Sequence, residues 1–104
     1  MTEKQALDLI VSKFRKKGYK VGTPESVIQS ATISELESMG WYVVKLIQTN
    51  TNGIPDLMCL KAGKAFFIEV KRIGEKPTAL QKYRHDQLRK IGFEVRVLSG
   101  NEVE

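Results

Sequence analysis

The stretch "GIPDLMCLKAGKAFFIEVK", which runs from Gly53 to Lys71, decides the fold. Two apolar runs, 56–61 and 65–71, lie on either side of a short Ala-Gly turn. Apolar runs of this length bounded by turn residues are typical of strands, so the pattern predicts a β-hairpin. Acidic and basic residues nevertheless stand at the outer ends of both strands, although a protein this small needs these strands for its hydrophobic core.

The register of this hairpin brings charged side chains together. A two-residue turn pairs Lys61 with Lys64, and Asp56 then lies directly opposite Glu69. Cross-strand partners share one face of the sheet, with Cβ atoms about 5 Å apart. Lys71 lies two residues beyond Glu69, so it shares that face. A three-residue turn would shift each partner by one, so this prediction depends on the turn.

Two carboxylates this close repel each other unless a proton or a cation lies between them. A hard divalent cation such as Mg²⁺ prefers oxygen ligands and would relieve the repulsion. The cation would polarise a phosphoryl oxygen and lower the pKa of a water, and Lys71 would hold that water or stabilise developing negative charge. The alternative is that Glu69 and Lys71 face water at a strand end. The apolar residues around Glu69 disfavour it, because an unpaired carboxylate among them would be costly.

The rest of the chain predicts an α/β fold in which a central mixed β-sheet of about four strands is flanked by helices. Helical spacing and capping residues predict helices over 2–18, 24–39 and 78–91, and apolar runs predict further strands over 41–49 and 93–99. Thr23 is the expected N-cap of the second helix, with Pro24 as its first residue. The strand over 41–49 is apolar almost throughout, which predicts a central position.

The predicted helix over 78–91 has an apolar stripe that we expect to face inward. Its members are Leu80, Tyr83, Gln87, Leu88 and Ile91. His85 lies off this stripe, which predicts an exposed histidine and not a catalytic base. In the strand over 41–49, Trp41 and Tyr42 are expected to be core or dimer contacts.

Length, charge and cysteine content bound the protein class. The chain has 104 residues, which suits one domain, and 17 Lys and Arg against 12 Asp and Glu give a net charge of +5, which favours polyanionic partners. The basic clusters at 13–20 and 82–90 are alternatively solvated helix faces. A single cysteine, Cys59, excludes an intrachain disulfide and a Cys-rich zinc site. The N-terminus lacks a secretory signal and no apolar run approaches the roughly 20 residues of a membrane span, so a cytoplasmic protein is expected.

These motifs together resemble a known family. "GIPD", an apolar strand, a turn and "FFIEVK" are similar to the PD-(D/E)XK nuclease motif. "PESVIQ" before them, and "ALQKYR" and "GFEVRVL" after them, resemble the VRR-NUC (virus-type replication-repair nuclease) family more closely. The resemblance covers about 23–99. It divides the chain into an N-terminal amphipathic basic helix and linker (1–22) and a VRR-NUC-like nuclease domain (23–104).

The resemblance implies a DNA nuclease with a PD-(D/E)XK restriction-endonuclease-like core that depends on Mg²⁺ or Mn²⁺. By position, Asp56 and Glu69 would bind the metal, and the main-chain carbonyl of Val70 would be a further ligand. Lys71 would be the catalytic lysine. Stand-alone members similar to this chain occur in phages, which makes a phage or bacterial protein the expectation.

The resemblance also assigns roles to two helical residues. Glu25 would be the helix carboxylate that reaches the metal, directly or through water, and Gln81 would support the site. Gln81 is alternatively only a capping-box partner of Thr78, and Glu25 only a first-turn charge. Glu35 lies on the same apolar arc as Glu25, about 15 Å away along the axis, so the two cannot serve one metal. We favour Glu25.

The function predicted is a metal-dependent DNA endonuclease, structure-selective and acting in replication, repair or recombination. The residues expected to contact DNA are Lys64, Arg72, Lys76, Lys82 and Arg84. One alternative is a Holliday-junction resolvase that works as a symmetric homodimer, because paired cuts require a two-fold axis; the first helix is the candidate dimer contact. Another is a non-catalytic nucleic-acid-binding module. The sequence leaves open whether a helicase delivers the substrate.

Overall fold

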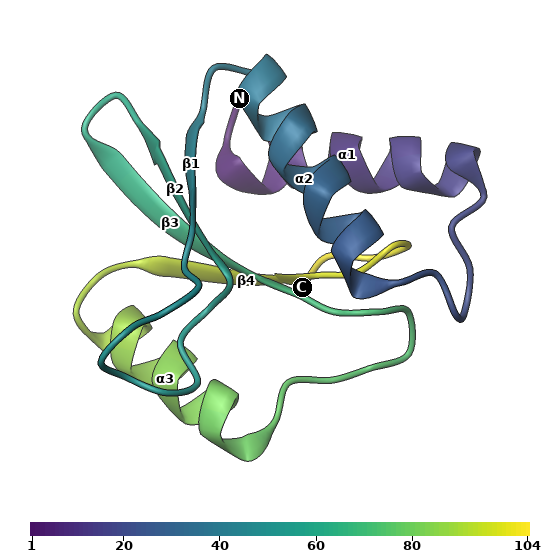
Figure 1. The fold of residues 1–104 in the computed structure, drawn as a ribbon. Helices are drawn as coiled ribbons and strands as arrows, with labels where there is room; N and C mark the ends of the chain where they lie inside the picture. The colour runs from purple at the N-terminus through teal and green to yellow at the C-terminus, as the bar shows by residue number, and fades with distance from the viewer.

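The protein is a three-layer arrangement in which helices cover both faces of a four-stranded sheet (Figure 1). The computed structural model describes residues 1–104. The elements are α1 (Glu3–Lys17), α2 (Glu25–Ser38), β1 (Tyr42–Lys45), β2 (Leu57–Lys61), β3 (Lys64–Val70), α3 (Ala79–Lys90) and β4 (Glu94–Leu98). α1 and α2 lie on one side of the sheet and α3 lies on the other. No helix is both long enough and apolar enough to span a bilayer.

The sheet has the strand order β1-β2-β3-β4 and is mixed. β1, β2 and β3 are antiparallel neighbours, whereas β4 runs parallel to β3. A parallel pair needs a crossover connection, and α3 supplies it between β3 and β4. The predicted fold class, a mixed sheet of four strands flanked by helices, is therefore confirmed.

The main core lies between the sheet and the helices α1 and α2. The apolar stripe of α1 is buried there and consists of Ala6, Leu7, Ile10, Val11 and Phe14. From β3, Phe66, Ile68 and Val70 face the same core. The apolar stripe of α1 packs inside the protomer, so it is not available to a dimer contact. A dimer contact through the rest of α1 stays a prediction.

The turn of the β2–β3 hairpin is the predicted two-residue turn. Ala62 and Gly63 both have positive φ angles, 51° and 77°, as a type I′ turn requires. Lys61 therefore pairs with Lys64, and the predicted register is confirmed. Because side chains alternate along β3, Glu69 points away from the core face, toward α3.

The position of β1 differs from the prediction of a central strand over 41–49. β1 covers only Tyr42–Lys45 and lies at one edge of the sheet. Its apolar run divides between two environments. Trp41 is buried against Phe66, with ring centroids 4.9 Å apart, whereas Tyr42 and Ile47 are exposed. A continuous apolar run therefore does not require burial on both faces of a sheet.

The orientation of α3 about its axis also differs from the prediction. The only buried residue of α3 is His85, which is 1% exposed. Leu80, Tyr83 and Ile91, which were expected to face inward, are 45%, 56% and 70% exposed. The prediction is wrong because the sheet face beneath α3 carries the polar side chain of Glu69, so the helix presents a polar residue to it.

The helix starts follow local capping chemistry with one exception. In α1, Thr2 and Gln5 form the expected capping box. In α2, the N-cap is Pro24 rather than the predicted Thr23, and no side chain caps the helix. The hydroxyl of Thr23 instead accepts a hydrogen bond from the Lys20 N–H at 3.0 Å, because it closes the turn before the helix.

Candidate active site

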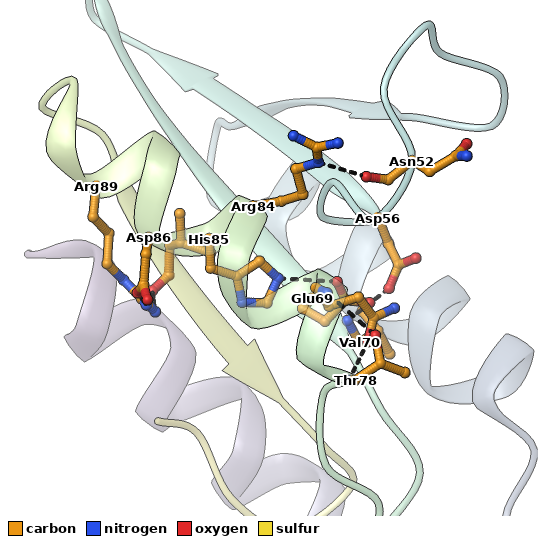
Figure 2. A network of polar contacts seen from close by, with 11 residues as sticks. Asn52, Asp56, Glu69, Val70, Thr78, Arg84, His85, Asp86 and Arg89 are labelled. Atoms are coloured by element: carbon orange, nitrogen blue, oxygen red, sulfur yellow. Dashed lines mark hydrogen bonds and ion pairs between the residues drawn. The ribbon is translucent and has the colours of Figure 1, made fainter.

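A pair of carboxyl groups lies where β2 begins and β3 ends (Figure 2). β2 pairs Leu57 with Ile68, so the next pair outward is Asp56 and Glu69. Asp56 is close enough to Glu69 to raise the pKa of the Glu69 carboxyl. Asp56 Oδ2 also accepts a hydrogen bond of 2.8 Å from the Val70 N–H. The hairpin thus holds two acidic side chains in contact at one end of the sheet.

Burial controls the ionisation of Glu69. Loss of solvent, the hydrogen bond that protonated Glu69 donates to Asp56 and the negative charge of Asp56 raise the pKa of Glu69 to about 9, and the charge of Lys71 opposes this rise. Without a cation, Glu69 therefore keeps its proton at neutral pH. A divalent cation would balance the charge of the two acids in place of this proton.

The donor set fits a hard cation. No three His, Cys, Asp or Glu side chains form a ligand set by themselves. Mg²⁺, however, is commonly bound through only one or two carboxylates and keeps several waters. Asp56 and Glu69 would supply those carboxylates, with the Val70 carbonyl and water as further oxygen donors.

Two other charged side chains act electrostatically on this pair. Glu25 stands half-buried in the first turn of α2, and its pKa is raised by burial first and by the charge of Asp56 second. Lys71 lowers the pKa of both Glu25 and Glu69, which places its ammonium group within electrostatic reach of both. Glu35, the rival of Glu25, pairs instead with Lys13 of α1 at 2.7 Å. The structure therefore brings Glu25, and not Glu35, to the carboxyl pair.

Gln81 has the capping role that the sequence left as an alternative. The side-chain amide oxygen of Gln81 accepts a hydrogen bond of 2.9 Å from the Thr78 backbone N–H, and the backbone N–H of Gln81 donates to the Thr78 hydroxyl at 3.2 Å. This capping box fixes the start of α3 beside the site. A direct role for Gln81 in the chemistry stays a prediction.

His85 is the residue at this site that sequence reasoning missed. Its Nε2 lies 3.1 Å from Glu69 Oε1, and the two side chains are buried against each other. Burial lowers the pKa of His85, and the charge of Arg89 lowers it further. One signal could have found it: His85 follows Gln81 by four residues, and such residues share a helix face.

The loop before Asp56 is docked onto α3. Gly53 has a positive φ of 83°, and a Cβ there would stand 2.8 Å from Leu80 Cγ. Arg84 Nε donates a hydrogen bond of 2.9 Å to the Asn52 carbonyl (Figure 2). These contacts fix the path by which the chain enters β2, and with it the position of Asp56.

We expect Gly53→Ala to destabilise the protein by about 1–3 kcal/mol, because alanine at this φ is strained and its Cβ meets α3. The matched control is Gly18→Ala, which has nearly the same φ, 80°, but nothing within 4 Å of the added Cβ. Thermal melts of both variants test this. Equal losses of stability in the two proteins would contradict a role for the contact with α3.

The predicted DNA-contacting residues do not form one cluster. Lys64 begins β3, at the far end of the strand from Glu69. Arg72 is paired with Glu75, and Lys76 lies 3.1 Å from Glu104. Their contact with DNA stays a prediction.

The two basic residues of α3 differ from each other. Lys82 is exposed and makes no ion pair. Arg84 is half-buried and bound to the Asn52 carbonyl and to Gln87. Arg84 therefore holds structure together, which leaves Lys82 as the freer of the two for phosphate contact.

The protein has an α/β fold with paired carboxyl groups at one end of its sheet. No protein-family profile matches the chain. The chain is 35% identical over 80 residues to "Putative nuclease p44" of Acyrthosiphon pisum secondary endosymbiont phage 1. The aligned region covers 76% of this chain and 86% of that protein. A solved structure described as "VRR_NUC domain" superimposes with a TM-score of 0.65 at 33% identity, over 74% of this chain and 84% of the other. The chain belongs to the VRR-NUC family, as its motifs predicted.

Proposed function

We propose that this protein is a DNA endonuclease that hydrolyses phosphodiester bonds with Mg²⁺ or Mn²⁺. The observation that carries the proposal is the contact between the Asp56 and Glu69 carboxyls, with Lys71 on the same face of the hairpin. A structural role alone does not explain two acids in contact at the end of a sheet. Their mutual repulsion at high pH is the cost that a bound dication would remove.

Each side chain has a separate task in this proposal. Asp56 is fixed by the Val70 N–H, so its carboxylate keeps one orientation. Glu69 would release its proton to solvent on binding a cation, and Glu25 would add a third carboxylate, directly or through water. A bound Mg²⁺ or Mn²⁺ supplies Lewis acidity toward the phosphoryl oxygen and acidifies a coordinated water. Lys71 orients the attacking water and stabilises the negative charge that develops on the phosphate.

The substrate follows from charge. The chain carries +5, and Lys82 is an exposed cation of α3 that makes no ion pair. Phosphate contacts of this kind make binding weaken steeply with salt. The proposed substrates are branched or forked DNA of replication, repair or recombination.

A second candidate, a symmetric resolvase for four-way junctions, is favoured by the outer face of α3. Leu80, Tyr83 and Ile91 are large apolar side chains that the protomer leaves exposed on this helix. Pairing of α3 with its copy across a two-fold axis would cover them and place two sites for paired cuts. This face replaces α1 as the proposed homodimer contact, and sedimentation at micromolar concentration tests it.

Metal removal is the direct test of the proposed activity. Purified protein is incubated with linear, forked, flapped and four-way DNA in Mg²⁺, Mn²⁺ or EDTA. We expect cleavage in either metal, with preference for branched substrates, and no detectable product in EDTA, because the phosphate then lacks the cation's polarisation. Cleavage that persists in EDTA would overturn the proposal. Salt-sensitive binding without cleavage in any metal would favour the non-catalytic module instead.

A further inference from the structure

The contact between His85 and Glu69 is a polar contact that is closed to solvent. Each side chain is 2% exposed, and the His85 Nε2 lies 3.1 Å from Glu69 Oε1. The ion pairs of Lys and Arg with carboxylates, by contrast, each have at least one partner that is half-exposed or more, or two partners exposed by 28% and 33%. The pair joins α3 to β3, two elements that meet face to face (Figure 2).

Stability alone is a weak reason for this pair. Two of its neighbours on the same face of the sheet are apolar: Phe67 lies two residues before Glu69 on β3, and Val97 is the partner of Glu69 on β4. The other two, Asp56 and Lys71, are charged residues of the site. Burying two polar groups requires removing both from water, and well-packed apolar replacements are often as stable or more stable. A polar pair in this place therefore points to a task of the Glu69 carboxyl itself.

The two acids of the site are held by different anchors. Asp56 Oδ2 accepts from the backbone N–H of Val70. Glu69 has a longer side chain with three torsions, and its anchor on the helix side is His85, which contacts one carboxyl oxygen, Oε1. Without this contact, the carboxylate would have to be ordered each time a cation binds. Residues that hold a ligand in this way commonly change metal affinity or activity by about 10–100-fold when they are mutated.

We propose that His85 is a positioning residue, which uses Nε2 to hold the Glu69 carboxylate in the orientation that binds the divalent cation. The inference rests on the proposed function, because it assigns His85 a part in the same metal site. His85 is not itself a ligand in this assignment and acts through Glu69.

The test measures metal binding without DNA, using full-length wild type, His85→Gln and His85→Leu. Gln can place its amide nitrogen near the position of Nε2, whereas Leu fills the space without a hydrogen bond. Mn²⁺ titration by calorimetry and by electron paramagnetic resonance gives the affinity. We expect about 10–100-fold weaker Mn²⁺ binding for His85→Leu, with most of the affinity restored in His85→Gln. Melting temperatures in EDTA check that each variant is folded, and Asp86→Asn on the exposed side of α3 is the matched control.

The outcomes separate this inference from the proposed function. Wild-type protein that binds no Mn²⁺ would overturn both. Wild-type binding that His85→Leu retains in full would overturn the role of His85 alone and leave the nuclease proposal standing. Nitrogen hyperfine coupling in the spectrum of Mn²⁺-loaded wild type, absent from His85→Leu, would make His85 a ligand and overturn the positioning role.

Discussion

Replacing Asp56 with asparagine is expected to lower DNA cleavage by roughly 10³-fold or more in Mg²⁺ or Mn²⁺ while leaving the protein folded. Asn keeps an oxygen that can accept the hydrogen bond from the Val70 N–H, so β2 and β3 stay joined as in the wild type. It removes the negative charge that a divalent cation needs, and a neutral amide beside Glu69 is a poor substitute for a carboxylate ligand.

Single-turnover cleavage of a four-way junction and of a forked duplex measures this effect, with circular dichroism as the check on folding. The matched control is Asp86→Asn, which removes the same charge from an exposed position on α3 that is paired with Arg89. Lys71→Ala should lose cleavage in the same experiment with little change in Mn²⁺ affinity, because its ammonium group acts on the phosphate. Cleavage by Asp56→Asn within about tenfold of wild type would be incompatible with the site we propose.

The hairpin that carries the acids could be predicted from the chain alone because its geometry is local. A two-residue turn at Ala62 and Gly63 fixes the register, and the register fixes that Asp56 stands opposite Glu69. The alternation of side chains then places Lys71 on the same face. None of these steps requires knowledge of the rest of the fold.

Residues brought from the helices could not be placed with the same certainty, because their positions depend on tertiary contacts. Glu25 and Glu35 occupy the same arc of α2, and only the pairing of Glu35 with Lys13 of α1 separates them. The face that α3 turns inward is set by the buried carboxyl of Glu69, so apolar spacing selected the wrong stripe and left His85 outside. In both cases a polar partner elsewhere in the chain outweighed the local apolar pattern.

Glu69→Gln is expected to abolish cleavage and at the same time to stabilise the metal-free protein at alkaline pH. Gln keeps the shape of the side chain, can donate to Asp56 and can accept from His85. It cannot ionise. The pKa of Glu69 is raised from an ordinary value of 4.5 to about 9, mainly by burial. The protonated form of Glu69 therefore contributes fully to the free energy of unfolding below about pH 4.5, and this contribution is lost as the pH rises through 9.

Melting temperatures in EDTA across this range measure the difference. We expect the variant and the wild type to melt together near pH 5 and to diverge above it, with the variant higher by about 5 °C or more at pH 9. Glu37→Gln, an exposed position on α2, is the control and should show no such divergence. Adding Mn²⁺ should raise the melting temperature of the wild type only, because a ligand stabilises the protein that binds it. Parallel melting curves of wild type and Glu69→Gln from pH 5 to pH 9 would mean that Glu69 is ionised in the folded protein without metal. The two carboxyls would then not share a proton, and their contact would no longer mark a place for a cation.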